Sequence, residues 1–189
     1  MSIKINYLNK SNSKSSANLV LFTNEKFDIS GLKKYLTNSE FSYINDLLKT
    51  NDLKKNLFVF ELTSKKKVVL ISIKKDLKSF DIENLGAELF GRINYGKNSD
   101  YFINSDSITS KHENLIGHFL HGLKLKSYEF NKYKTKKETR LISINILGNK
   151  NKPSAQNQLK FKALEEGTFY ARDLVSEPGN VLHPDEYAK

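Results

Sequence analysis

The sequence predicts an α/β fold, specifically a three-layer α/β/α sandwich built on a mixed sheet. Apolar runs short enough for strands alternate along the chain with segments in which apolar residues recur at helical spacing. The run Leu19–Phe22 is apolar throughout, which is typical of a strand covered on both faces. Two further runs, Leu57–Leu62 and Val68–Ile73, are separated only by residues 63–67, so we expect a hairpin there. Such a pair argues against an all-parallel sheet.

The other predicted elements follow the same two periodicities. Further strands are expected at Ile3–Leu8, Ala17–Thr23, Tyr101–Ile103 and Arg140–Leu147. Helices are expected from Ser30 to Leu36, across Phe41–Leu48, from Asp81 to a stop at Gly96, behind Ser110, and from Ser154 to Ser176. The run Lys65–Lys67 is expected to be a solvated turn.

Local signals mark several boundaries. Ser30 is a candidate cap, and Ser110–Glu113 has the pattern of a capping box, in which hydroxyl and carboxylate each bind an amide at a helix start. The helix behind that box is expected to bury Leu115, Ile116, Phe119, Leu120 and Leu123. Pro178 ends the last helix because proline disfavours a helical residue before it and donates no amide. Gly148–Pro153 combines turn residues with a break in periodicity, so it is the best linker candidate.

The composition excludes several classes of protein. The chain has 189 residues and no cysteine, which removes disulfides, thiolate zinc sites and a cysteine nucleophile. No apolar run approaches the ~20 residues that a membrane span needs, and the first residues lack the apolar stretch of a signal peptide. We therefore expect a cytoplasmic protein with no membrane partner.

The charge is strongly positive. Lys plus Arg is 31 and Asp plus Glu is 21, which gives a net charge of +10. Such a surplus is compatible with binding a polyanion. Nearly all of it is lysine, however, whereas base recognition favours arginine. A chain rich in Lys, Asn and Ile is also typical of a low-GC genome, and we favour that explanation.

Two stretches have a distinctive motif. The first runs Ala171-Arg172-Asp173-Leu174-Val175-Ser176-Glu177-Pro178-Gly179-Asn180-Val181-Leu182-His183-Pro184, and the second is Gly122–Lys136 with Ser127-Tyr128-Glu129-Phe130-Asn131-Lys132-Tyr133-Lys134 inside it. Together they resemble the leucyl aminopeptidases, also called cytosol aminopeptidases. The first is similar to the segment where that family's linking helix enters the catalytic domain, and the second to the end of a late helix in its N-terminal domain. Ser176 and Gly179 depart from the family, which has Asn and often Ala at these positions.

The resemblance covers about residues 115–184 and implies a fold and a parent enzyme. The fold would be macro-domain-like. The parent would remove N-terminal residues from peptides, use two divalent metals, manganese or zinc, and assemble as a hexamer. The family's metal-binding motifs do not occur in this sequence, so no catalytic and no metal-ligating residue is assigned to it.

The resemblance also divides the chain. Residues 1–150 would be the N-terminal macro-like domain, 151–177 the linker helix, and 178–189 the start of the catalytic domain. That last segment resembles the first residues of the family's catalytic domain, and the sequence ends within it. We therefore expect a truncated form of a longer protein rather than a free-standing α/β domain. The fragment alone is expected to be inactive, with roles in hexamer assembly and in access to the active site.

The residues themselves offer few other sites. His118 and His121 have a spacing that places both on one side of a helix, but Phe119 and Leu120 between them must face the core, so boundary histidines are expected rather than a metal site. Gly86, Gly91 and Gly96 are evenly spaced but fall in and after a helix, which is not the position of a phosphate-binding loop.

The alternative function is a DNA-binding module that uses the basic segment 124–140. Its possible nucleic-acid contacts are Lys124, Lys126, Lys132, Lys134, Lys136, Lys137 and Arg140. Tyr128, Phe130 and Tyr133 lie among them, and lysines beside exposed aromatic rings can hold phosphates and stack bases. We expect instead that the aromatic residues pack into the core and that the lysines are solvated.

Overall fold

The computed structural model describes residues 2–8, 18–93, 99–110, 112–135, 141–183 and 185. Within these residues, strands form one mixed sheet in the order β1-β6-β5-β2-β4-β3. The strands are β1 (Ser2–Tyr7), β2 (Asn18–Thr23), β3 (Leu57–Thr63), β4 (Lys66–Ser72), β5 (Ser99–Asn104) and β6 (Leu141–Leu147). The helices are η1 (Ser30–Tyr35), α1 (Asn38–Thr50), α2 (Ser79–Ile93), η2 (Ser105–Ser107), α3 (Leu115–Lys126) and α4 (Ala155–Ser176).

The sheet is mixed because of the predicted hairpin. Strand β3 runs antiparallel to β4, with Val59 opposite Val69. All other neighbouring strands are parallel. One residue from each of β4, β2, β5 and β6 lies in register across the centre of the sheet. These residues are Val69, Val20, Ile103 and Ile146, and all four are buried.

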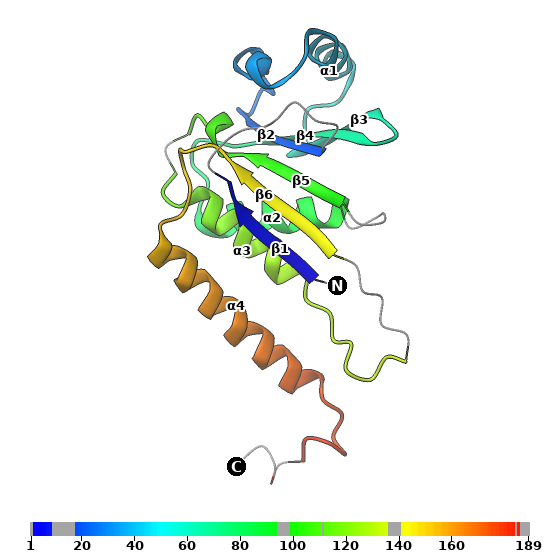
Figure 1. The fold of residues 1–189 in the computed structure, drawn as a ribbon, viewed down its shortest axis with the longest axis vertical. Coiled ribbons are helices and arrows are strands. Elements are labelled where there is room, and N and C mark those ends of the chain that lie inside the picture. Colours follow the sequence, from blue (N-terminus) through cyan, green and yellow to red (C-terminus); the bar gives the residue numbers. More distant parts are fainter. Residues whose placement is uncertain are drawn as a thin grey trace.

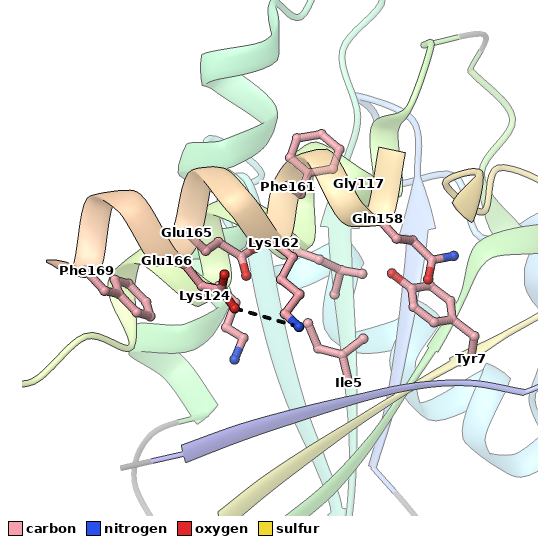
Figure 2. A pocket seen from close by; sticks show the side chains of 11 residues that line it. Ile5, Tyr7, Gly117, Lys124, Gln158, Phe161, Lys162, Glu165, Glu166 and Phe169 are labelled. Carbon is pink, nitrogen blue, oxygen red and sulfur yellow. Dashed lines mark ion pairs between the residues drawn. The ribbon is translucent and has the colours of Figure 1, made fainter. Parts of the chain in front are cut away.

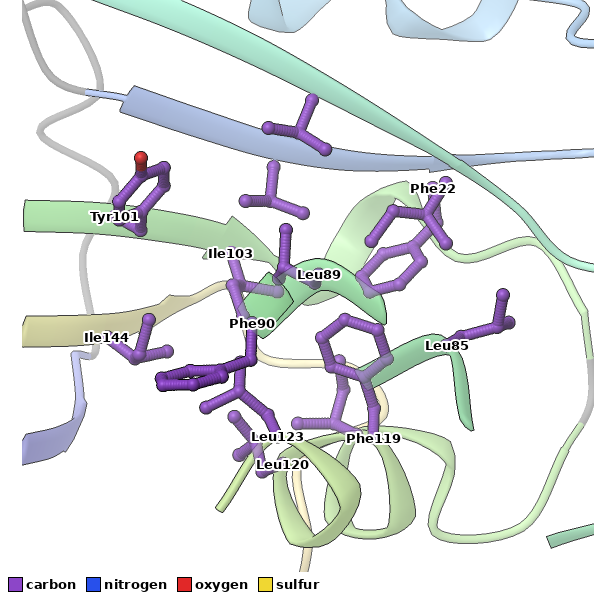
Figure 3. Close-up of a cluster of buried hydrophobic side chains, with 14 of the residues drawn as sticks. Phe22, Leu85, Leu89, Phe90, Tyr101, Ile103, Phe119, Leu120, Leu123 and Ile144 are labelled. Carbon is purple, nitrogen blue, oxygen red and sulfur yellow. The ribbon is translucent and has the colours of Figure 1, made fainter. Parts of the chain in front are cut away.

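Helices cover both faces of the sheet, which confirms the three-layer prediction (Figure 1). Strand β2 shows why. Val20 and Phe22 join a core beneath α2 and α3, whereas Leu19 and Leu21 join a second core beneath η1 and α1. Successive side chains of a strand point to opposite faces, so an unbroken apolar run fills both layers. Figure 3 shows the larger core. In it the rings of Phe22 and Phe119 pack edge to face, with their centroids 5.4 Å apart.

Two sequence-based boundary predictions are wrong. Ser30 does not cap its helix: Ile29 is the N-cap of η1, without a side-chain cap, while Thr37 caps α1 in a reciprocal pair with Glu40. The predicted capping box at Ser110 also fails, because α3 begins only at Leu115 after Asn114 in a left-handed conformation. Lys111, inside that box, and Gly96, the predicted stop of α2, lie outside the described residues.

The turn prediction for Lys65–Lys67 is right in part. Lys65 lies in an exposed turn, whereas Lys66 and Lys67 belong to β4 and pair with Glu40 at 2.6 Å and Glu61 at 2.5 Å. The predicted linker Gly148–Pro153 has no helix or strand and connects β6 to α4. The segment Gly148–Pro153 packs against the body: the Asp106 carboxylate accepts the amides of residues 149 and 150 at 3.0 and 2.8 Å.

Helix α4 lies beside the α2 and α3 layer and carries the chain away from the sheet (Figure 1). Its end at Ser176 confirms the predicted stop before Pro178. In the part of the chain that is described, no helix is both long enough and apolar enough to cross a membrane.

Candidate functional site

The first half of α4 is anchored to the body by one aromatic ring. Phe161 is the buried residue of this helix. Its ring lies directly over Gly117 of α3, where a Cβ atom would come within 2.4 Å of it. The rings of His118 and His121 flank it at 5.0 and 5.4 Å. Glycine at position 117 therefore creates the seat that Phe161 occupies.

A groove of about 400 Å³ opens beside this anchor between β1, α3 and α4 (Figure 2). We call it the α4 groove. It is lined by Ile5, Tyr7, Gly117, Leu120, Lys124, Gln158, Phe161, Lys162, Glu165, Glu166 and Phe169. Its floor is mostly apolar, and its charged groups come from α3 and α4.

The polar groups of the α4 groove interact with each other or with the nearby backbone. Burial and the nearby Glu165 carboxylate raise the pKa of Tyr7 to about 12, so its hydroxyl stays protonated at neutral pH. His121 Nδ1 lies 3.4 Å from Glu165 Oε1, and Lys124 Nζ donates to the carbonyl of Ile3 at 3.1 Å. These contacts connect α4 to α3, and α3 to the edge strand β1.

The second half of α4 is held by a polar cluster that we call the latch. It joins the segment after α3 to the end of α4 and consists of Tyr128, Lys132, Tyr133, Arg172, Asp173 and Glu177. The Tyr128 hydroxyl donates to Asp173 Oδ1 at 2.7 Å, and Lys132 Nζ donates to Glu177 Oε1 at 2.5 Å. Tyr133 donates to the other oxygen of Glu177.

The charges in the latch stabilise one another. Hydrogen bonds from Lys132 and Tyr133 lower the pKa of Glu177, and the bond to Glu177 raises the pKa of Lys132. Arg172 contributes a contact of a different kind, because its Nη1 donates to the carbonyl of Leu125 at 2.7 Å, near the end of α3. The latch thus links both segments that carry the motifs found in the sequence.

The predicted nucleic-acid residues have different surroundings where the structure describes them. Lys124 lines the α4 groove, and Lys132 is paired with Glu177. Lys126 and Lys134 are exposed. Lys136, Lys137 and Arg140 lie outside the described residues. The lysines of the described segment therefore differ in their contacts and in their exposure.

The aromatic residues of that segment pack differently from the prediction. They do not enter the core. Tyr128 packs on Phe169 of α4 with ring centroids 5.4 Å apart, and Phe130 packs on Tyr133 at 5.8 Å. Tyr133 remains 51% exposed. The spacing of these rings is thus explained by contact with α4 and with each other.

His118 and His121 point to different carboxylates. His118 Nδ1 lies 2.8 Å from Glu83 of α2, and His121 contacts Glu165 of α4. His121 is buried and His118 partly buried, so the expected boundary position fits His118 better. Over the described residues, no group of three or more potential ligands gathers around one point.

Sequence reasoning missed Tyr7, Phe161 and Glu165. Nothing in their local pattern distinguishes them, because they become neighbours only when β1 and α4 are placed against α3. Gly117 carried a weak signal, since a glycine inside an apolar helix often marks a close approach.

Comparison with known proteins identifies relatives of this chain. No family model matches it. It is 38% identical over 101 residues to a probable cytosol aminopeptidase of Clostridium perfringens, which covers 49% of this chain and 20% of that protein. The chain thus spans about a fifth of the length of this curated relative.

Solved structures show the same fold. A mutant of tomato leucine aminopeptidase superposes with a TM-score of 0.69 at 16% identity, covering 99% of this chain and 41% of that one. The bottromycin maturation enzyme BotP in complex with Mn gives 0.62 at 12% identity, with 92% and 35% covered. The chain is thus similar to cytosol aminopeptidases over part of their length, which is consistent with their N-terminal domain.

Proposed function

We propose that this chain is the non-catalytic N-terminal domain of a two-metal leucyl aminopeptidase, a cytosolic enzyme that removes N-terminal amino acids from peptides. The observation that carries the proposal is the latch. The two segments that resemble the family, one around Tyr128 and one around Asp173, are far apart in the sequence and bind each other in the fold. Tyr128 and Asp173, which belong to the two matched segments, thus help to fix the direction in which α4 leaves the body.

The same contacts support a division of the chain into three segments. Residues 1–150 would form the body, 151–177 the linker helix, and 178–189 the entrance to the catalytic domain. An anchor at Phe161 and a latch at Glu177 hold α4 at two separate points, so the helix can act as a rigid spacer. We assign to the body a role in assembling the parent hexamer and in shaping access to its active site.

The metals belong to the parent in this proposal. BotP, one of the structural neighbours, was solved with Mn. We assign the two divalent ions, manganese or zinc, to the portion of the parent that this chain does not span. In their sites they would activate water and polarise the peptide carbonyl.

A pair of activity measurements tests the proposal. The purified chain is expected to leave leucine p-nitroanilide uncleaved with added manganese or zinc. A chimera in which the chain replaces the matching region of the Clostridium perfringens protein is expected to assemble and to cleave the same substrate. Metal-dependent turnover by the chain alone would contradict a non-catalytic role, and a chimera that folds but never assembles would contradict an assembly role.

The DNA-binding module is the second candidate. It is favoured by the net charge of +10 and by the exposed Lys126 and Lys134. It ranks second because Glu177 neutralises Lys132 and a backbone carbonyl engages Lys124. A salt titration of duplex binding separates the candidates, since phosphate contacts give an affinity that falls steeply with salt. Binding weaker than micromolar at low salt removes this candidate.

A further inference from the structure

Helix α4 turns a wide apolar face away from the body. The large side chains on it are Leu159, Leu164, Tyr170 and Val175, exposed by 67, 49, 67 and 87%. The small residues Ala163, Gly167 and Ala171 lie between them and are also exposed. At 3.6 residues per turn, all seven fall within an arc of about 160°. We call this arc the outer face. The body contacts the opposite side of α4 through Phe161 and Phe169.

We propose that the outer face binds the outer face of a second copy of this chain, as an antiparallel pair of helices around Gly167. This inference does not rest on the proposed function, because it concerns a surface that the chain itself exposes. A two-fold contact requires a patch that complements itself. Gly167 lies at the centre of the arc and near the middle of the helix, so a two-fold axis beside it relates the two halves of α4.

Side-chain sizes alternate as such a contact needs. In the antiparallel pair, residues about equally far before and after Gly167 lie opposite each other. Leu164 then faces the partner's Ala171, and Tyr170 faces the partner's Ala163. Large residues opposite small ones let two helices interdigitate without voids.

Gly167 supplies the space for close approach. A Cβ atom built on it meets no atom within 4 Å in this chain, so the fold itself does not require glycine there. Glycine within a helix lowers helix stability by roughly 0.5–1 kcal/mol relative to alanine. A helix–helix crossing at this point would use the space that glycine leaves open.

Charge favours the antiparallel direction. Lys160 lies within the outer face near the start of α4, and the last turn of α4 contains no basic residue. An antiparallel copy places Lys160 against the carbonyl end of the partner helix, which carries a partial negative charge. A parallel copy would place the two Lys160 side chains against each other.

The size of the surface sets the expected strength. A helix of 22 residues is about 33 Å long, so one helix face buries less than the ~800 Å² per partner of a standard interface. A monomer–dimer equilibrium in the micromolar range is therefore expected, and sedimentation velocity over a concentration series measures it. Leu164→Glu, at an exposed position, is expected to weaken the dimer at least tenfold while the circular dichroism of the monomer is unchanged.

Cysteine cross-linking locates the contact. Because the chain has no cysteine, Gly167→Cys introduces a single thiol at the centre of the outer face. Mild oxidation is expected to give a disulfide-linked dimer of this variant. The matched control is Lys162→Cys on the same helix, whose side chain is 69% exposed but turned off the outer face, and it is expected to stay largely monomeric. A chain that remains monomeric up to several hundred micromolar, or equal cross-linking of both variants, overturns the proposal.

Discussion

At the scale of single residues, two glycines set the distance between α2 and α3. A Cβ atom on Gly86 would come within 1.9 Å of the carbonyl oxygen of Phe119, and one on Gly122 within 1.9 Å of that of Glu83. The atoms in the way belong to the backbone, which cannot move aside as a side chain could. The even spacing of glycines noticed in the sequence thus has a packing explanation at position 86. Gly91, in the same helix, has open space around it.

A pair of alanine substitutions checks this explanation. Gly86→Ala is expected to lower the free energy of unfolding by about 1–3 kcal/mol, because α2 and α3 must separate. Gly91→Ala is the control in the same helix and is expected to be neutral or stabilising by up to about 1 kcal/mol. Urea denaturation measures both. Equal effects of the two substitutions would show that helix propensity, not the close approach, governs position 86.

At the scale of elements, the anchor and the latch attach α4 to the body by different chemistry. The anchor at Phe161 is apolar and requires glycine at position 117, because a Cβ atom there would collide with the ring. The latch is polar and depends on the ionised carboxylate of Glu177, bound by Lys132 and Tyr133. Acid should therefore loosen the latch and leave the anchor in place.

The sign of this pH dependence follows from the lowered pKa of Glu177. A carboxyl whose pKa is lower in the folded state contributes stability above its ordinary value of 4.5, and the contribution is lost as pH falls through the folded value. An NMR titration is expected to show the amides around Tyr128 and Glu177 shifting below pH 4.5. Glu177→Gln should show the loosened spectrum already at neutral pH, whereas Glu166→Gln, exposed on the same helix, should not. Latch amides that do not titrate in the native protein would contradict the account.

At the scale of the whole molecule, the sheet separates two cores and α4 belongs to neither. The row Val69, Val20, Ile103 and Ile146 is shared by the strands at the centre. Helix α4 contacts the body through one stripe. Removing a central side chain should therefore affect all of the fold, and removing the anchor should affect α4 alone.

Hydrogen exchange distinguishes these two effects. Ile103→Ala is expected to lower the global free energy of unfolding by about 2–5 kcal/mol and to speed exchange in β2, β5 and β6 together. Phe161→Ala is expected to speed exchange across α4 while the strands stay protected as before. If Phe161→Ala exposes the strands equally, α4 is part of the cooperative core.

The sequence by itself determined most elements and the layers, because apolar periodicity is a local property. The unbroken apolar run Leu19–Phe22 predicted burial on both faces, and the short gap before Val68 predicted the hairpin. Helix starts were less predictable. Ser110 does not cap α3, because the helix begins only at Leu115, after Asn114 in a left-handed conformation.

Only the tertiary structure decided what α4 contacts. Leu164 and Val175 are exposed on the outer face, whereas Phe161 and Phe169 contact the body. The latch could not be predicted either, because Tyr128 and Asp173 are 45 residues apart in the sequence. The only feature that linked them was that both lie in segments resembling the same family. Periodicity shows which side chains share a face. It does not show which segment covers that face. Such contacts join residues far apart in the sequence, and a local pattern carries no information about them.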